Sequence, residues 1–228
     1  MGITALLMID MQNSYVADDG VRDALGWPPI WRLEETIAAC TDLLAAARAQ
    51  GLPVIYSRST GSAAGTLGEN PRIARLLAHR GHLIPEVGKT EREWKRRIMD
   101  AVAPRSGEVV LDKTRASFFD YTELDPLLHN LNVRRLVVAG LQTNVCVEAT
   151  ARAALARNFE VAVPSDAVST DGPALHEGAL NSLRVLYTEV APWREILALD
   201  AVWERAFATP NYGRDPAYWD ETVVNTRS

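Results

Sequence analysis

The fold is decided by the stretch VVAGLQTNVCVEAT, which occupies residues 137–150. An apolar run ends at Gly140, a short polar turn follows, and Cys146 stands at the start of an Ala-rich segment. This order predicts a buried strand, a tight turn and a helix with a cysteine in its first turn. Read alone, the stretch fits either a structural thiol or a nucleophile.

Other apolar runs along the chain repeat this alternation of strand and helix. We expect strands at residues 5–9, 53–57, 108–112, 135–140, 159–163 and 187–190. We expect helices at residues 33–47, 91–102, 124–131, 144–157 and 173–186. The pattern predicts a three-layer α/β/α fold with a mostly parallel, Rossmann-like sheet of six strands.

Length and composition favour a single domain over residues 1–228. The chain has 228 residues, 47% of them hydrophobic, which is enough for one sizeable core. Residues 192–228 carry three of the six tryptophans, so we expect this C-terminal extension to pack on the domain or on a neighbouring subunit. Residues 59–70 are rich in small and polar residues and predict a flexible loop at the sheet edge.

Charge and targeting signals argue against nucleic-acid and membrane partners. The net charge is −5 and no basic run stands out. The chain has no apolar stretch long enough to span a membrane, and its first ten residues lack the features of a secretory signal. With only Cys40 and Cys146, a disulfide framework is not expected and a reducing cytoplasm is.

Three chemically capable side chains stand at predicted strand ends. Asp10 follows the first strand, Lys113 follows the third, and Cys146 follows the fourth. Parallel strands place their carboxyl ends at one edge, where open α/β sheets bind ligands. A helix N-terminus and a nearby lysine favour a thiolate, and a carboxylate can accept and return a proton. These are the parts of a thiol acyl-transfer enzyme with Asp in place of His.

Each of these residues also has an ordinary structural explanation. Asp10 could cap a turn, and Lys113 could extend its ammonium to water. Arg58 could bind a substrate carboxylate or form a surface ion pair. Cys40 lies on the apolar face of the helix at residues 33–47 and is best explained as a buried hydrophobe.

His79 and His82 suggest a metal site only weakly. Gly81 lies between them, and no acidic or cysteine partner is close in sequence. We therefore expect no metal at these residues.

At this point the chain resembles the isochorismatase-like cysteine hydrolases, which include nicotinamidases and several amidohydrolases of ureides and carbamoyl compounds. The residues that carry the resemblance are LMIDMQN at 7–13 with Tyr15, Lys113 with SFF at 117–119, and GLQTNVCV at 140–147. The resemblance extends from the first strand to about residue 190. The three motifs in this order make a strong combined signal, although each alone is weak.

The resemblance implies specific roles for the strand-end residues. Cys146 would be the nucleophile that forms a thioester, Asp10 the general base and then the acid, and Lys113 the residue that orients Asp10. A cis peptide bond is implied at Leu141–Gln142, with the amides of Gln142 and Cys146 as the oxyanion hole. Gln142 departs from the small residue usual at this position, so its side chain points into either the pocket or the core.

The resemblance also implies the substrate class. Nicotinamidases carry an Asp and His metal cluster after the second strand, and residues 57–61 here contain no His, so neither a metal nor another cofactor is expected. The cysteine favours C–N hydrolysis over vinyl-ether cleavage. The expected substrate is a small linear amide or ureide, in a homo-oligomer that is a dimer or tetramer. Candidate substrate contacts are Tyr15, Arg58, Phe118, Phe119 and Asn144.

Three alternatives stay open at this point. The same residues could hydrolyse a cyclic or natural-product amide such as a lactam. The chain could instead be a non-catalytic binding or assembly scaffold, which the intact set of strand-end residues argues against. Cys146 could be a redox sensor, although Cys40 is an unsuitable partner for it.

Overall fold

The computed structural model describes residues 3–17, 22–23, 26–60, 71, 75, 78–79, 82, 88–186 and 188–198. The strands in this part are β1 (Ile3–Ile9), β2 (Val54–Ser59), β3 (Val109–Lys113), β4 (Val133–Leu141), β5 (Glu160–Pro164), β6 (Val168–Ser169) and β7 (Glu189–Ala191). The α-helices are α2 (Leu33–Ala49), α4 (Lys89–Arg96), α5 (Leu124–Asn130), α6 (Glu148–Leu155), α7 (Pro173–Val185) and α8 (Trp193–Leu197). Shorter helical turns are η1 (Asn13–Tyr15), η4 (Asp100–Val102) and η5 (Thr143–Val147).

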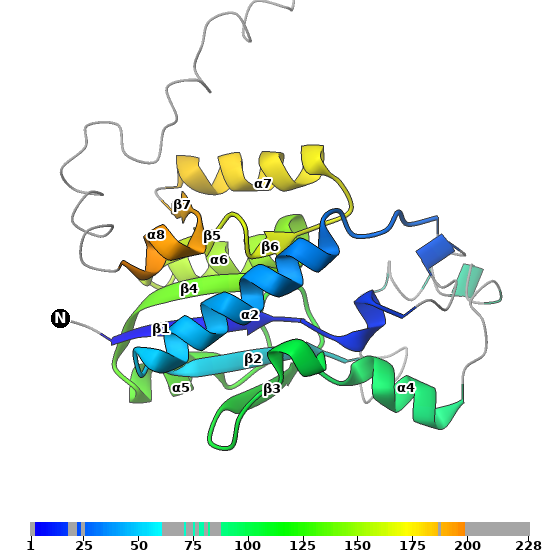
Figure 1. Ribbon diagram of the computed structural model, residues 1–228, viewed down its shortest axis with the longest axis horizontal. Helices are drawn as coiled ribbons and strands as arrows, with labels where there is room; N and C mark the ends of the chain where they lie inside the picture. Colours follow the sequence, from blue (N-terminus) through cyan, green and yellow to red (C-terminus); the bar gives the residue numbers. More distant parts are fainter. Residues whose placement is uncertain are drawn as a thin grey trace, which may run out of the picture.

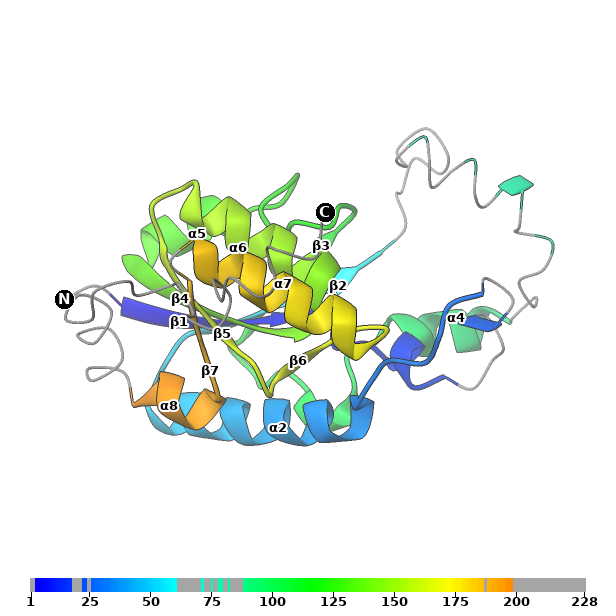
Figure 2. The ribbon, with the colours of Figure 1, turned by 90° about the horizontal axis from the view of Figure 1, so that it is seen from above.

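The strands form one parallel sheet between two helical layers. Helices α2 and α8 lie on one face, and α5, α6 and α7 lie on the other (Figures 1 and 2). This confirms the predicted α/β/α fold class. None of the helices in the described segments is long and apolar enough to cross a membrane.

The strand order places two strand ends at a topological switch point. The sheet runs β3-β2-β1-β4-β5-β7, and every adjacent pair is parallel. The chain moves outward from β1 to β3 and then returns to β4 on the other side of β1. The carboxyl ends of β1 and β4 therefore flank the crevice where such sheets bind ligands.

Two hydrophobic cores hold the layers together, one on each face of the sheet. Strand β1 contributes to both, because successive side chains point to opposite faces. Leu6 and Met8 pack in the core beneath α2, whereas Leu7 and Ile9 pack in the core beneath α5, α6 and α7. Because β1 is buried on both faces, its sequence is a continuous apolar run rather than an alternating one.

The sequence missed one strand among the described residues. Strand β6 is only two residues long, and it pairs with the end of β4 through Gly140 and Val168. Such a short strand leaves no periodic pattern in the sequence. The sheet therefore has seven strands over this part of the chain, one more than predicted.

The predicted helix at residues 91–102 is wrong beyond Arg96. The backbone at Arg97 is extended, Ile98 forms a bridge to Gln12, and a separate short turn, η4, follows. Burial explains the break, because Ile98 and Met99 enter the core while α4 itself buries no side chain.

Two predictions fall largely outside the described residues. The loop predicted at residues 59–70 is described only at its start, and the C-terminal extension only up to residue 198. Within the extension, Trp193 is buried and α8 packs against α2.

Candidate active site

Four neighbouring strands each deliver one polar side chain to the same edge of the sheet. Lys113 is the last residue of β3, Ser57 lies near the end of β2, Asp10 directly follows β1, and Cys146 lies in η5 after β4. Because the strands are parallel, all four side chains come from carboxyl ends, as the sequence analysis expects for three of them.

The side chains of Asp10, Lys113 and Cys146 meet in a contact that is almost closed to solvent. The Lys113 ammonium lies 2.7 Å from Oδ2 of Asp10 and 3.2 Å from Sγ of Cys146. Its Nζ also donates a hydrogen bond of 3.0 Å to the carbonyl of Arg115. The Asp10 and Lys113 side chains are each 1% exposed. The structure thus brings together the three residues that the sequence predicts to act as a unit.

Ser57 holds the Asp10 carboxylate in place. Its hydroxyl accepts a hydrogen bond of 3.0 Å from the Asp10 backbone N–H and donates one of 2.6 Å to Oδ1 of Asp10. Asp10 adopts a left-handed φ of 47°, which is uncommon outside glycine and is tolerated best by Asp and Asn. These bonds fix both the backbone and the carboxylate, and they leave Oδ2 facing Lys113.

Sequence reasoning did not identify Ser57 as a site residue. The available signal is a hydroxyl at the end of an apolar strand next to the strand that ends in Asp10. The hydroxyl can be assigned to the site only once the pairing of β1 with β2 is known, in which Met8 lies opposite Tyr56.

The turn that carries Cys146 is the elbow, defined here as residues 140–147. Gly140 has a φ of +111°, and a Cβ placed on it would lie 2.2 Å from the Ile9 carbonyl oxygen, so only glycine fits. The Leu141–Gln142 peptide bond is cis, as the resemblance implies. The backbone then forms a π-turn in which the carbonyl of Gln142 accepts hydrogen bonds from the N–H groups of Val145 and Val147.

Side chains of the elbow form hydrogen bonds with the segment after β6. Gln142 Nε2 donates a hydrogen bond of 2.6 Å to Oδ1 of Asp171, which also pairs with Arg22 at 2.5 Å. Asn144 Oδ1 accepts a hydrogen bond of 2.5 Å from Thr170. The side chain of Gln142 is therefore bonded to Asp171, and Asn144 is engaged by the protein itself.

The electrostatics at Cys146 differ from the thiolate that the sequence predicts. Burial, followed by the negative charge of Asp10, raises the pKa of the Cys146 thiol to about 12, although Lys113 acts to lower it. The helix terminus and the lysine do not offset the loss of water and the adjacent carboxylate. The resting site therefore holds a neutral thiol beside an ion pair.

Lys113 remains charged within this buried group. Burial lowers the pKa of its ammonium, but the negative charge of Asp10 and the hydrogen bonds to Asp10 and Cys146 raise it by more, so the net shift is upward. A protonated Lys113 beside a protonated thiol leaves the Asp10 carboxylate as the proton acceptor of the site.

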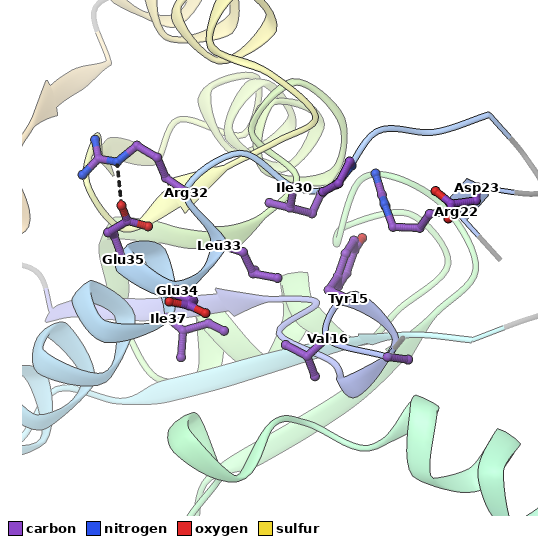
Figure 3. A pocket seen from close by; sticks show the side chains of 12 residues that line it. Tyr15, Val16, Arg22, Asp23, Ile30, Arg32, Leu33, Glu34, Glu35 and Ile37 are labelled. Carbon is purple, nitrogen blue, oxygen red and sulfur yellow. Dashed lines mark ion pairs between the residues drawn. The ribbon is translucent and has the colours of Figure 1, made fainter. Parts of the chain in front are cut away.

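Tyr15 lines a cavity of about 680 Å³. Burial raises the pKa of the Tyr15 phenol, and the negative charge of Asp10 raises it further. Figure 3 shows Tyr15 pointing toward Arg22 at the rim of the cavity, with Ile30 and Leu33 from the facing segment. The volume suits a small organic ligand.

Four predicted substrate contacts, Asn144, Arg58, Phe118 and Phe119, are absent from the described lining of this cavity. Arg58 forms an ion pair with Asp112 through bonds of 2.6 and 3.0 Å, which is the surface pair that the sequence analysis left open. Phe118 and Phe119 are buried in the core beneath α5 and α6.

Cys40 lies in the core, as its position in the sequence predicts. Its side chain is fully buried, and its thiol donates a hydrogen bond to the carbonyl of Ala167. His79 and His82, which the sequence offers as weak metal ligands, are both exposed. Over the residues that can be described, His, Cys, Asp and Glu form no group of three or more that could hold a metal ion.

Comparison with known proteins gives concordant matches across the chain. The family model for the isochorismatase domain matches residues 4–195. A ureidoacrylate amidohydrolase RutB of Methylorubrum extorquens is 30% identical, with 86% of this chain and 84% of that protein covered. Its counterpart from Pantoea ananatis is 32% identical, with 77% of this chain and 73% of that protein covered.

Solved structures support the same fold. An isochorismatase family protein from Desulfovibrio vulgaris has a TM-score of 0.71 and 32% sequence identity, covering 90% of this chain and 100% of that chain. An N-carbamoylsarcosine amidase from Thermoplasma acidophilum has a TM-score of 0.63 at 24% identity, covering 84% of this chain and 96% of that one. The second match bears on the fold alone.

Proposed function

Since this chain belongs to the isochorismatase family, we propose that it hydrolyses a C–N bond in a small linear amide or ureide. The observation that carries the proposal is the position of the Lys113 ammonium, which contacts both the Asp10 carboxylate and the Cys146 sulfur. Relatives at 30–32% identity are named ureidoacrylate amidohydrolases, which supports a ureide as substrate.

The first half of the reaction forms a thioester. Oδ2 of Asp10 takes the thiol proton as Sγ of Cys146 attacks the substrate carbonyl carbon, so that no resting thiolate is needed. The carbonyl oxygen becomes an oxyanion that the backbone N–H groups of Gln142 and Cys146 receive. Asp10 then gives its proton to the departing nitrogen, and ammonia or an amine leaves.

The second half returns the enzyme to its starting state. A water molecule gives a proton to Asp10 and attacks the thioester carbonyl. The C–S bond breaks, the acid product leaves, and the proton on Asp10 passes back to the Cys146 sulfur. Lys113 stays protonated throughout and balances the negative charge of whichever partner is ionised, which its raised pKa supports.

The cavity beside Tyr15 is proposed to receive the part of the substrate farthest from the scissile bond. Tyr15 keeps its phenolic proton, so its hydroxyl is a hydrogen-bond donor for a carbonyl or ureido oxygen. The proposal places no cofactor in the reaction, since residues 57–61 lack the His of metal-dependent relatives. The proposal also includes a single catalytic domain, a cytoplasmic location and a homo-oligomer. Light scattering of the purified chain tests the oligomeric state.

Ammonia release from a panel of small amides tests the activity. The panel contains linear ureides, carbamoyl amino acids, simple amides and lactams, assayed with and without a chelator. We expect turnover of at least one ureide or carbamoyl compound, with no effect of the chelator. Turnover of lactams alone would replace the linear substrate by a cyclic one, and no turnover by the folded chain would overturn the proposal in favour of a scaffold.

The two cysteines supply a matched pair of variants. Cys146→Ala removes the nucleophile, so we expect ammonia release to fall at least ~10³-fold. Cys40→Ala removes the same group from the core, and we expect kcat within about twofold of the unsubstituted chain. Equal activity of the two variants would contradict the assignment of the nucleophile.

A further inference from the structure

Three consecutive residues of the elbow send their side chains to one segment, residues 170–176, after β6. Gln142 donates to Asp171, Asn144 accepts from Thr170, and Thr143 Oγ1 lies 3.0 Å from Nδ1 of His176. Thr143 and His176 are buried, and burial lowers the pKa of the His176 imidazole. The elbow is thus held by side chains as well as by its own backbone.

Asp171 is the one of these partners that also pairs with a residue of the cavity lining, Arg22. Its Oδ1 receives Gln142 Nε2 at 2.6 Å and Arg22 at 2.5 Å, and the side chains of Asp171 and Arg22 are 25% and 20% exposed. Arg22 lines the cavity of Figure 3, and its guanidinium also donates to the carbonyl of Pro28. One carboxylate oxygen therefore joins the cavity rim to the elbow.

The joined residue, Gln142, is one of the two whose backbone N–H groups receive the oxyanion in the proposed reaction. The carbonyl of Gln142 is fixed by Val145 and Val147, and its side chain is fixed by Asp171. With both ends held, the direction of the Gln142 backbone N–H is set. A preorganised donor of this kind is effective only when it points at the place where the oxyanion forms.

We propose that Asp171 is a positioning residue that aligns the Gln142 N–H for the oxyanion and connects it to Arg22 at the cavity rim. The inference rests on the proposed function, because it concerns the same reaction. Asp171 acts through Gln142 and touches none of the reacting atoms. Its loss lowers kcat more than it raises KM, because the misaligned donor acts mainly in the transition state.

A test that does not need the true substrate uses a small aldehyde, isobutyraldehyde. The Cys146 sulfur adds to its carbonyl carbon, the thiol proton passes to Asp10, and the oxygen becomes an oxyanion with no leaving group to expel. Protection of Cys146 from iodoacetamide by the aldehyde measures how well that oxyanion is held. The alkylation rate without aldehyde measures the thiol alone.

Asp171→Ala and Gln142→Ala are expected to weaken aldehyde protection by on the order of tenfold, while leaving the unprotected alkylation rate within about twofold. Aldehyde protection in the double variant should be no weaker than in the more affected single variant, since both substitutions break the same hydrogen bond between Gln142 and Asp171. Asp42→Ala is the matched control, because Asp42 forms a surface ion pair with Arg194 at 3.2 Å. It should behave as the unsubstituted chain.

Exchanging the Gln142 amide and the Asp171 carboxylate distinguishes a positioning role from a simple loss of structure. Gln142→Glu places two carboxylates together and should weaken protection, and the added change Asp171→Asn should restore it by reversing donor and acceptor. Thermal melting of each variant shows whether it is folded. Unchanged protection in Asp171→Ala, no rescue by the exchange, or no protection of the unsubstituted chain would overturn the inference. A chain that shows these effects but releases no ammonia would count against the proposed function alone.

Discussion

The hydroxyl of Ser57 bonds to Asp10 twice, accepting from its backbone N–H and donating to its carboxylate. The two residues are 47 positions apart in the chain, and the pairing of β1 with β2 brings them together. Both side chains are buried, so no water replaces either bond if one partner is removed. Ser57 therefore determines where the Asp10 carboxylate, the proposed proton acceptor, points.

Ser57→Ala should lower both stability and turnover. The variant leaves a buried N–H and a carboxylate oxygen without partners, which costs about 1–3 kcal/mol in the free energy of unfolding. The freed carboxylate can rotate, so we expect kcat to fall by on the order of tenfold. Urea unfolding and ammonia release measure the two effects. Ser165→Ala, a partly buried serine with no hydrogen bond from its hydroxyl in the described structure, should change neither.

The buried ion pair of Lys113 and Asp10 predicts an unequal response to single and double substitution. Lys113→Met leaves a carboxylate buried beside an apolar chain, and we expect a loss of about 3–5 kcal/mol. Lys113→Met with Asp10→Asn removes both charges but keeps an oxygen for Ser57 and a residue type that tolerates the φ of 47°, so it should be more stable than Lys113→Met alone. Neither variant should release ammonia. A double variant less stable than the single one in urea unfolding would contradict this prediction.

The pH dependence of alkylation distinguishes a neutral resting thiol from a thiolate. The pKa of Cys146 is raised to about 12, so its thiolate fraction should increase about tenfold per pH unit from pH 7 to 10. In Cys40→Ala, where Cys146 is the remaining thiol, the iodoacetamide rate should keep rising above pH 9. An exposed thiol levels off there instead. A plateau below pH 9 would show that Lys113 dominates over burial and Asp10.

The same shift has a consequence for stability. Because the pKa of Cys146 is higher in the folded chain than in the unfolded chain, the folded state holds more protons between about pH 9 and 12. The free energy of unfolding should therefore be unaffected below pH 9 by this group and should fall as the pH rises above it. Cys40, whose pKa burial also raises to about 12, contributes in the same direction.

Gly140→Ala should be among the most damaging single changes in the sheet. Its φ of +111° disfavours any side chain, and the new Cβ would lie 2.2 Å from the backbone of Ile9, which cannot move without disturbing β1. We expect a loss above about 4 kcal/mol. Gly107→Ala is the control, because Gly107 has a φ of +92° with open space around it. It should cost about 1–2 kcal/mol, as judged by thermal melting.

Much of the site could be predicted because its signals are local in sequence. Apolar runs that end in Asp10, Lys113 and Gly140 identify buried strands and their polar ends without knowledge of the pairing order. Parallel packing then requires these ends to share an edge. The sequence therefore predicted the contact of Asp10, Lys113 and Cys146 before any distance was known.

The remaining features depend on contacts between distant segments. Ser57 and Asp171 lie next to ordinary polar residues in the sequence, and their partners are set by tertiary packing. The neutral thiol of Cys146 follows from burial, which no motif displays. Residues 97–102 continue a helical pattern, but the bridge between Ile98 and Gln12 replaces the helix with extended backbone.

Each of four neighbouring strands supplies one polar side chain at the sheet edge, so the site is complete only when all four strands have docked. Lys113 comes from the edge strand β3, and the partners it meets come from β1 and from the far side of β1, with β2 between them. A folding intermediate that has not yet added β3 would hold Cys146 and Asp10 but not the Lys113 ammonium that contacts both. If the proposed reaction requires Lys113, recovery of ammonia release during refolding should follow the docking of the outermost strand rather than the collapse of the core.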